Sequence, residues 1–487
     1  MATIQVNVKW GKEHVPVEVK AGQTPDELFA HLQDRTGVPI ARQKLMARGA
    51  WKGVLKQGME MKLADGQNIM LMGTADVLLK PAVETKFLED ITEAEQARSG
   101  LVLPAGFANL GNTCYMNSTL QCLRAVPELR ASLSTQQQDL AGALNTTYAQ
   151  LDASTQPVEP ATFVATLRSQ FPQFAQTGRG GGFLQQDAEE LYSSLFANLA
   201  SSLKEGESNT VDKLFGLEME ETLSCPECEA EPDVVRKDTA RKLICNIQGG
   251  TAGDNVNHLY EGLKLGLVGS LEKNSQILGR DAVWTKKSAV SKLSPYLCIQ
   301  YMRFFWKATP DSADHTGVKC KIMRPVSFTD TLDAFPYCDA KLQAAIKANR
   351  DRLGAKLDLD ADKEPEPKKA KADDDATMEE PDEDLAAALA LSMKAEALPK
   401  HAALLESCGL DKDFQGHYEL FAIVTHKGRS ADGGHYMGWV KREDGSWLVF
   451  DDDLVSESSW EFVQGLKGGG DEHMSYLQFY RAKKGGI

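Results

Sequence analysis

The chain has 487 residues, of which 42% are hydrophobic and 25% are charged, so it can bury a large core. A formal net charge of −15 argues against a general nucleic-acid binder, because phosphate neutralisation requires a basic surface. No apolar run approaches the roughly 18 residues of a membrane span, and the start of the chain has no signal pattern. Nine cysteines are too sparse for a disulfide scaffold, so we expect a cytoplasmic protein, with the nucleus as a second location.

Residues 1–75 are predicted to form a small separate unit. Two alternating segments, 4–10 and 15–19, predict a β-hairpin, and a capped helix start at Thr24 is followed by two further short strands. Strand, strand, helix, strand, strand is the β-grasp order. The segment therefore resembles a ubiquitin-like domain, although it lacks the di-glycine end by which ubiquitin is conjugated.

Alternation along the last two strands of this unit turns one set of side chains outward. Met46, with Met70 or Met72, is a candidate for that set, and an exposed methionine patch suits adaptable binding. The alternative is that these are ordinary core methionines. The resemblance implies a docking module, commonly for the proteasome.

Residues 76–103 are mixed and charged, and we interpret them as a linker that ends before a larger region, 104–483. Within that region, Asp, Glu, Lys, Ala and Pro dominate residues 356–384 and aromatic residues vanish. Such a composition cannot bury enough apolar surface to fold, so a disordered acidic insert is predicted.

An alanine-rich helix with an acidic entry is predicted over 383–396. Leu385, Ala388 and Ser392 share one face of it. The segment resembles a ubiquitin-interacting motif, a helix that lies on the apolar patch of ubiquitin. The alternative is a helix that packs against the rest of the larger region.

Cys114 lies where a loop meets the start of a predicted helix. Asn112 and Thr113 are good N-caps, and Met116 and Leu120 recur at helical spacing. A cysteine in the first turn faces unpaired backbone N–H groups and the positive end of the helix dipole, which favours the thiolate. This placement predicts a reactive nucleophile.

A thiolate nucleophile requires a base and a group that orients the base. His435 stands apart among nine histidines, because two glycines precede it and an alternating strand follows. A second apolar strand ends in three aspartates, of which Asp451 is the predicted orienting carboxylate and Asp452 the alternative. Asp453 is interpreted as a turn residue.

Three segments resemble the boxes that define ubiquitin-specific proteases. They are the cysteine box at 109–118, the Gln-Gln-Asp box at 185–187 and the histidine box at 433–436. The resemblance implies a triad of Cys114, His435 and Asp451.

The same resemblance implies further roles around the triad. Asn109 matches the side chain that, with the Cys114 backbone N–H, stabilises the oxyanion. Gln185, Asp187 and Tyr436 are expected to contact substrate, with Asp187 paired to an arginine of the extended ubiquitin tail.

Cys225 and Cys228 have the spacing of half a zinc ribbon. Many family members carry a second such pair downstream, but here Cys245 stands alone. Four ligands cannot be assembled from the expected positions, so we expect no metal. The sequence resembles the subgroup whose zinc site has degenerated.

The family resemblance covers about 104–350 and 400–483. It implies an α+β protein in which the β-grasp domain precedes a papain-like protease domain with thumb, palm and fingers. The expected activity is cofactor-free hydrolysis of isopeptide bonds at the C-terminal glycine of ubiquitin. The expected substrates are conjugates bound to the proteasome, where the enzyme would recycle ubiquitin and regulate degradation. The ubiquitin-like N-terminus makes the chain resemble the proteasome-associated member of the family.

The expected partners are ubiquitin, ubiquitinated proteins and the regulatory particle of the 26S proteasome, but neither nucleic acid nor membrane, and the protein is expected to be a monomer. Two alternatives remain: a non-enzymatic ubiquitin receptor, and a hydrolase for another ubiquitin-like modifier. The glycine-flanked segment 428–434 immediately precedes His435 and is a candidate cover for the cleft. Weak activity alone, and stronger activity on the proteasome, is therefore expected.

Overall fold

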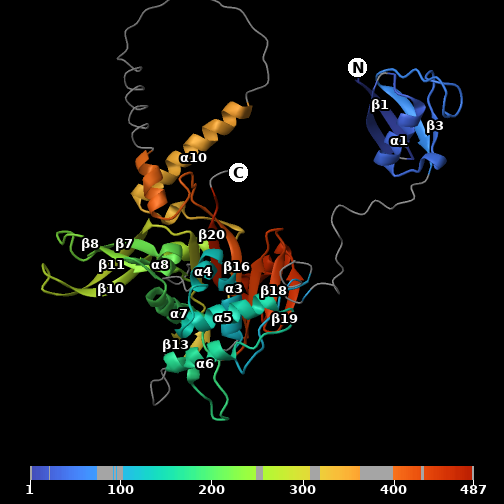
Figure 1. The fold of residues 1–487 in the computed structure, drawn as a ribbon. Helices are drawn as coiled ribbons and strands as arrows, with labels where there is room; N and C mark the ends of the chain where they lie inside the picture. The colour runs from blue at the N-terminus through green and yellow to red at the C-terminus, as the bar shows by residue number, and fades with distance from the viewer. Residues whose placement is uncertain are drawn as a thin grey trace, which may run out of the picture. The chain divides into compact units, whose positions relative to one another are not determined.

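The chain forms two compact units, Met1–Ile91 and Thr92–Ile487, in a computed structural model of α+β class (Figure 1). The structure describes residues 3–11, 13–20, 22–73, 92, 95, 102–247, 256–307, 318–361, 399–428 and 433–484. The predicted linker 76–103 lies largely outside these residues, and the predicted helix 383–396 lies wholly outside them. Within the described ranges, no helix is both long enough and apolar enough to cross a membrane.

The first unit is a four-stranded sheet packed against one helix. Its elements are β1 (Thr3–Trp10), β2 (Glu13–Lys20), α1 (Pro25–Thr36), η1 (Ile40–Arg42), β3 (Lys44–Met46) and β4 (Gln67–Met72). The sheet order is β2-β1-β4-β3, in which β1 and β4 are parallel and the other two pairs antiparallel. The predicted hairpin is confirmed, and so is the helix start, because Thr24 and Glu27 exchange the hydrogen bonds of a capping box.

Alternation in these strands separates a buried face from an exposed one. Val6, Val8 and other apolar residues form a core with α1. Met46 and Met70 are paired across β3 and β4 on the opposite face, where they are 37% and 45% exposed, and Met72 is 41% exposed. The methionines are therefore on the surface, and the alternative of core methionines is wrong.

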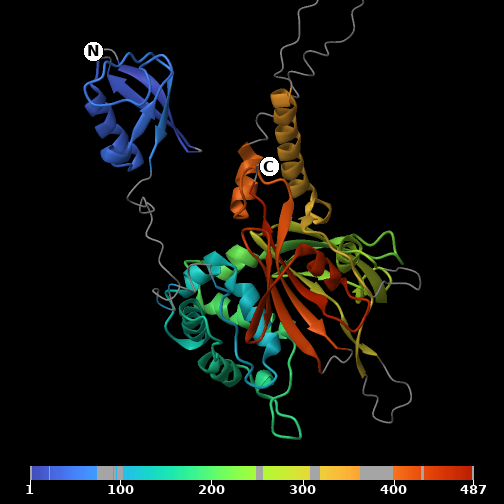
Figure 2. The same ribbon diagram turned by 90° about the vertical axis from the view of Figure 1, so that its right-hand side faces the viewer.

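The second unit begins with a layer of helices. They are α3 (Cys114–Arg124), α4 (Pro127–Leu133), α5 (Asp139–Ala153), α6 (Ala161–Gln170), η3 (Pro172–Ala175), α7 (Ala188–Ser202) and α8 (Thr210–Phe215). Figure 2 shows this layer in teal and green beside the red strands that the last part of the chain, residues 417–482, contributes to the main sheet. Apolar residues from both sides, such as Leu120, Leu195 and Phe479, bury each other in one core.

The main sheet of this unit has eight strands. Seven follow the order β19-β18-β17-β16-β20-β12-β9, and β15 pairs with β16. Their bounds are β9 (Leu243–Cys245), β12 (Tyr296–Tyr301), β15 (Thr331–Asp333), β16 (His417–Lys427), β17 (His435–Lys441), β18 (Trp447–Asp451), β19 (Leu454–Ser458) and β20 (Met474–Ala482). The predicted strands around His435 and before Asp451 are thus confirmed and are neighbours in the sheet.

Several smaller elements flank this sheet. They are α9 (Leu259–Gly266), β13 (Phe304–Lys307), β14 (Val318–Lys321), η4 (Phe335–Tyr337), α10 (Ala340–Ala361), α12 (Trp460–Gln464) and η5 (Gly465–Lys467). Helix α10 continues to Ala361, so residues 356–361 of the predicted disordered insert 356–384 are helical. Lys356, Leu357, Leu359 and Ala361 are good helix formers, which explains why the helix continues past the predicted start of the insert.

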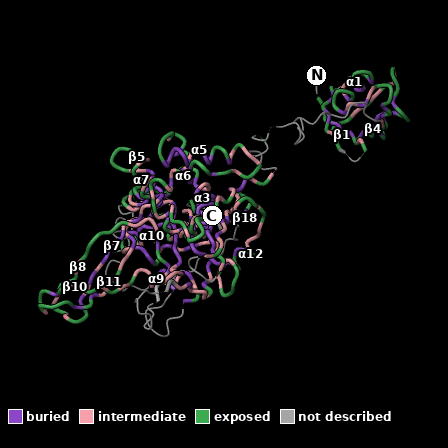
Figure 3. Tube along the Cα trace, turned by 90° about the horizontal axis from the view of Figure 1, so that it is seen from below, coloured by how far each residue is buried: buried purple, intermediate pink, exposed green. Residues whose placement is uncertain are grey.

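A second, four-stranded sheet projects from the body of the unit. Its strands are β7 (Leu217–Ser224), β8 (Val234–Ala240), β10 (Val268–Ser275) and β11 (Arg280–Lys292), in the order β10-β11-β7-β8, and a short hairpin, β5 (Lys204–Glu205) and β6 (Ser208–Asn209), precedes it in the chain. Figure 3 shows this projection as largely exposed. Cys225 and Cys228 lie in the turn after β7, whereas Cys245 ends β9 in the main sheet.

Helix α3 packs directly on β17, which brings the two predicted catalytic segments together. A Cβ built on Gly438 would lie 3.0 Å from the carbonyl oxygen of Ser118 in α3. A side chain at position 438 would therefore push the helix and the strand apart. The absence of a side chain at this position fixes the close approach on which the site depends.

Candidate active site

Cys114 is the first residue of α3 and is only 3% exposed. The preceding loop is held by Asn109, whose Oδ1 accepts hydrogen bonds from the backbone N–H groups of Gly111 and Thr113. The predicted side-chain cap is wrong, because Thr113 instead accepts a bond from Leu110 N and makes no cap bond. The Thr113 side chain thus does not accept from the first turn, whereas its carbonyl oxygen accepts from Met116 N at 3.0 Å, and the positive end of the helix dipole at Cys114 suits stabilisation of a negative charge there.

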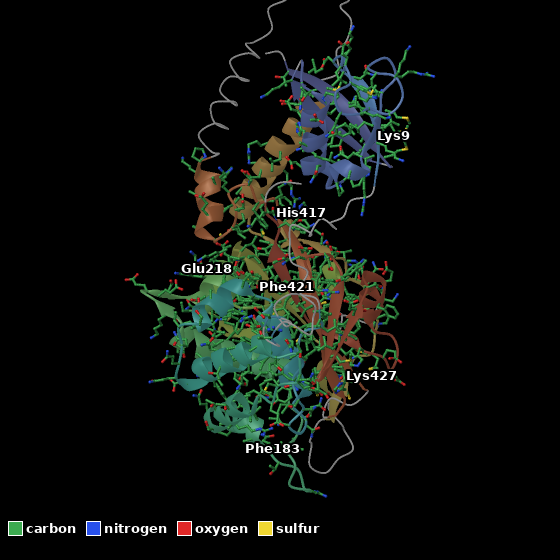
Figure 4. All side chains as sticks on the ribbon, turned by 45° about the vertical axis from the view of Figure 1, so that its right-hand side comes forward. Lys9, Phe183, Glu218, His417, Phe421 and Lys427 are labelled. Atoms are coloured by element: carbon green, nitrogen blue, oxygen red, sulfur yellow. The ribbon has the colours of Figure 1, made fainter. Side chains whose placement is uncertain are left out.

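Asn112 shapes the other side of this loop. It adopts a left-handed φ of 54°, and its Nδ2 donates to the carbonyl oxygen of Phe183 at 2.8 Å. Figure 4 labels Phe183 and both ends of β16; Lys427 and Phe183 lie toward one end of the unit, and His417 lies toward the other. Lys427 pairs with His435, so the site is at the end of the sheet that Lys427 marks.

His435 and Asp451 form the second part of the site. Nε2 of His435 lies 2.5 Å from Oδ1 of Asp451. His435 is the first residue of β17 and Asp451 the last of β18, and because these neighbouring strands are antiparallel, the two residues lie at the same end of the sheet. A hydrogen bond with Cys114 and, to a smaller extent, one with Asp451 raise the pKa of His435 to about 9, against the opposing effect of burial. The imidazole is therefore held between sulfur and carboxylate and is protonated at neutral pH.

Asp452 has a different set of partners from Asp451. Its Oδ2 accepts from Asn109 Nδ2 at 2.7 Å, and its Oδ1 accepts from Asn117 Nδ2 at 2.8 Å. Asp452 thus ties the cysteine segment to the end of β18, while Asp451 alone of the two contacts His435. The structure favours Asp451 over Asp452 as the orienting carboxylate.

Asp451, Asp452 and His435 are also side chains of the types that can bind a metal ion. Among the described residues, the ligand atoms of His435, Asp451 and Asp452 lie within 4.8 Å of one another. Each of the three side chains already has a hydrogen-bond partner from the site itself. The grouping is explained by those bonds.

The Gln-Gln-Asp segment reaches the sulfur. Gln185 Nε2 lies 3.6 Å from Cys114 Sγ, so it presents an amide donor at the nucleophile. Asp187 is the N-cap of α7, accepting from Glu189 N at 2.8 Å and from the Tyr476 hydroxyl at 2.6 Å. Contact of Gln185 and Asp187 with substrate stays a prediction.

Tyr436 lies in the interior, in contrast to the expectation of a substrate contact. It is 2% exposed, and burial raises the pKa of its hydroxyl well above the ordinary value. The residue after His435 points to the opposite side of β17, which is why it enters the core. Leu385, Ala388 and Ser392 lie outside the described residues.

The sequence did not single out His473, a second histidine at the site. Its ring centroid is 6.1 Å from that of His435, and its Nδ1 lies 3.1 Å from Thr425 Oγ1. Burial, followed by the charge of His435, lowers the pKa of His473 to about 4, so it stays neutral beside an imidazolium. No motif or spacing marks this residue, since it reaches the site from the position immediately before β20, which is remote in sequence.

A thiol, an imidazole and a carboxylate in this order, with an amide donor at the sulfur, are the arrangement of a cysteine hydrolase. Residues 105–480 match the family model described as ubiquitin carboxyl-terminal hydrolase, and the chain belongs to this family.

Full-length relatives agree with this assignment. Ubiquitin carboxyl-terminal hydrolase 6 of Arabidopsis thaliana is 38% identical over 98% of each chain, and the protein of that name in Schizosaccharomyces pombe is 32% identical over 99% of each chain. Ubiquitin carboxyl-terminal hydrolase 14 of Caenorhabditis elegans is 30% identical over 98% of this chain and 93% of its own. The protein is thus a cysteine-type deubiquitinating enzyme.

Proposed function

We propose that Cys114, His435 and Asp451 carry out the hydrolysis of isopeptide bonds at the C-terminal glycine of ubiquitin. The observation that supports this most directly is the His435 imidazole, which lies 2.5 Å from the Asp451 carboxylate and whose pKa is raised by its interaction with Cys114. The thiolate attacks the glycine carbonyl carbon, and the imidazolium gives its proton to the departing lysine amine. Water then cleaves the thioester, losing a proton to His435, and ubiquitin leaves with a free carboxylate.

Stabilisation of the oxyanion is assigned to amide donors near the sulfur. The Cys114 backbone N–H and one N–H of Asn109 are the candidates from the sequence, and the position of Gln185 Nε2 adds a third. One amide N–H of Asn109 is engaged by Asp452, and the amide group has two. Asn109 can therefore hold Asp452 and still donate toward the site.

A ubiquitin probe with a C-terminal electrophile tests the catalytic assignment. The full chain should form a covalent adduct, and Cys114→Ala should form none, because no thiol attacks the probe. Adduct formation by Cys114→Ala would contradict the assignment, and absence of an adduct in the parent chain would favour the receptor alternative. Parallel probes made from other ubiquitin-like modifiers test the remaining alternative, a hydrolase for another modifier, which should react with one of those probes in preference to the ubiquitin probe.

We further infer that the first unit is a ubiquitin-like domain that docks the enzyme on the proteasome, where it recycles ubiquitin from bound conjugates. The β-grasp order of its elements supports this, and so does the methionine patch, defined as Met46, Met70 and Met72. Beside the patch is a hollow of about 500 Å³, with Trp51 in its lining. Flexible methionines around a hollow suit insertion of an apolar side chain from a partner.

Charge substitution in the patch tests the docking. The double variant Met46→Glu with Met70→Glu should lose co-sedimentation with purified 26S proteasome, since two buried carboxylates would oppose an apolar contact. Arg35 is an exposed residue of α1, and Arg35→Glu lowers the net charge by two, as the double methionine variant does. It is therefore the matched control. Equal co-sedimentation of the patch variant and the control would refute this docking surface.

A further inference from the structure

Lys321 is a buried lysine at the end of β14, and its side chain reaches the segment that leads to His435. The residue is 9% exposed. Its Nζ donates to the carbonyl oxygens of Gly428 at 2.8 Å and His426 at 3.1 Å, and lies 2.6 Å from His426 Nδ1. An ammonium group has three N–H donors, and these three acceptors satisfy them.

The His426 ring is the surface against which Gly434 lies. A Cβ on Gly434 would stand 2.6 Å from His426 Nε2 and 2.2 Å from the carbonyl oxygen of Lys427. The φ of Gly434 is 143°, and the next residue, His435, pairs with Lys427 at the start of β17. The position of the His426 ring therefore sets the path by which the backbone reaches His435.

The glycines on the two sides of this connection also approach each other. A Cβ on Gly428 would lie 3.1 Å from the Cα of Gly434. Lys321 binds the carbonyl of Gly428 directly and supports Gly434 through the His426 ring. A side chain from a different hairpin thus holds both glycines.

The protein keeps this lysine at an electrostatic cost. Among the described residues no carboxylate forms an ion pair with it, and the buried Arg303 is a second cation nearby. Burial, followed by the charge of Arg303, lowers the pKa of Lys321 to about 7. An apolar side chain of similar length would fill the space without that cost, which points to a role for the three hydrogen bonds.

We propose that Lys321 is a positioning residue for catalysis: through Gly428 and the His426 ring it fixes the backbone at Gly434 and hence the place of the His435 imidazole. The inference rests on the proposed role of His435. Misplacement of a catalytic group by about 1 Å is sufficient to lower a rate by two orders of magnitude. Lys321 itself touches no reacting atom.

The test compares Lys321→Met with Lys441→Met in the full chain. Lys441 is also a largely buried lysine, but its bonds to Asp330 and Glu419 lie at the far end of β17. With a fluorogenic ubiquitin substrate, Lys321→Met should lower kcat about 10- to 100-fold with KM within about 2-fold. Lys441→Met should keep kcat per folded molecule. Unchanged kcat in Lys321→Met, with unfolding no earlier than in the control, would overturn the proposal.

A second readout follows the sulfur without ubiquitin. Alkylation of Cys114 by iodoacetamide, measured by mass spectrometry as a function of pH, should shift to higher pH in Lys321→Met, because the displaced imidazolium no longer supports the thiolate. A general loss of stability would not produce this shift. An alkylation profile identical to that of the parent chain would contradict the positioning role.

His426→Ala keeps the proposal testable if Lys321→Met does not fold. It should lower kcat in the same direction, and the loss in the double variant should be smaller than the product of the two single losses, since both side chains act on the backbone at Gly434. Additive losses would overturn the shared mechanism. His435→Ala distinguishes failure of the proposed triad from failure of the proposed role of Lys321. If His435→Ala retains activity, the triad is wrong. If His435→Ala is inactive and Lys321→Met is fully active, only the role of Lys321 is wrong.

Discussion

The charge of His435 is the property on which the chemistry of the site depends most. Its imidazole is bonded to Cys114 and to Asp451, and these partners raise its pKa to about 9. In the proposed mechanism, this imidazolium protonates the leaving amine after the sulfur has attacked. The neutral His473 beside it adds no competing positive charge.

The pH dependence of hydrolysis tests this charge. Because the pKa of His435 is raised, its protonated form persists up to about pH 9, and kcat/KM of the parent chain should fall as the pH rises through that value. Asp451→Asn removes one of the two supporting partners and should move this limb down by about one unit. The exposed Asp453→Asn is the control. An alkaline limb that does not move in Asp451→Asn would contradict the assignment of the orienting carboxylate.

For single residues, the sequence predicted the position of a residue on its helix or strand better than the direction in which its side chain points. Local patterns placed Cys114 at a helix start and His435 at a strand start, and both positions are confirmed. They could not decide between Asp451 and Asp452, because that depends on where β18 ends and on the φ of 53° at Asp452. The burial of Tyr436 follows from which face of β17 packs on the helices, which the segment alone does not reveal.

At the scale of elements, the projecting sheet has a tip held by carboxylates. The turn after β7 contains Glu227, which accepts from Arg280 Nη2 at 2.7 Å and from Val283 N at 2.8 Å. In the same turn, Glu231 accepts from the Ser275 hydroxyl and from the backbone N–H of Gln276 at 3.2 Å. These bonds join the turn that carries Cys225 and Cys228 to the β10–β11 hairpin.

The tip should loosen when Glu231 loses its charge. The Ser275 bond, and then the backbone bonds, hold the pKa of Glu231 below its usual value, so its contribution is present above the ordinary glutamate pKa and is lost as the pH falls through the lowered one. Glu231→Gln should therefore lower the protection of the β10–β11 hairpin amides against hydrogen exchange at neutral pH. Glu229→Gln, in the same turn, is the control. Equal exchange in the two variants would show that the carboxylate of Glu231 does not hold the tip.

At the scale of the whole molecule, the two units have separate cores. The apolar cluster of the first unit, which includes Val6 and Leu28, contains no residue of the second among the described residues. The second unit closes its own core between α3 and the main sheet. Each unit therefore has what it needs to fold alone.

Deletion of residues 1–91 tests this independence. The remaining chain should unfold within about 2 °C of the corresponding transition of the full protein, because its core is unchanged. Its basal hydrolysis of a fluorogenic ubiquitin substrate should also be unchanged, while the proposed binding to the proteasome should be lost. A large fall in unfolding temperature, measured by calorimetry, would mean that the units stabilise each other.

The sequence by itself determined the α+β class, the hairpin and capped helix of the first unit, and the segments that carry Cys114, His435 and Asp451. The hairpin, the capped helix and these segments follow from periodicity, capping and turn residues, which act over a few neighbouring positions, whereas the α+β class is what the family resemblance implied.

Only the tertiary structure decided which groups surround those residues. Gln185, His473 and Lys321 come from elements remote in sequence from the histidine strand, and their positions depend on how helices and strands pack. The close approach of α3 to β17 at Gly438 likewise appears only when the two are packed together. The chemistry of this site depends on contacts between distant segments, and such contacts leave no local pattern in the chain.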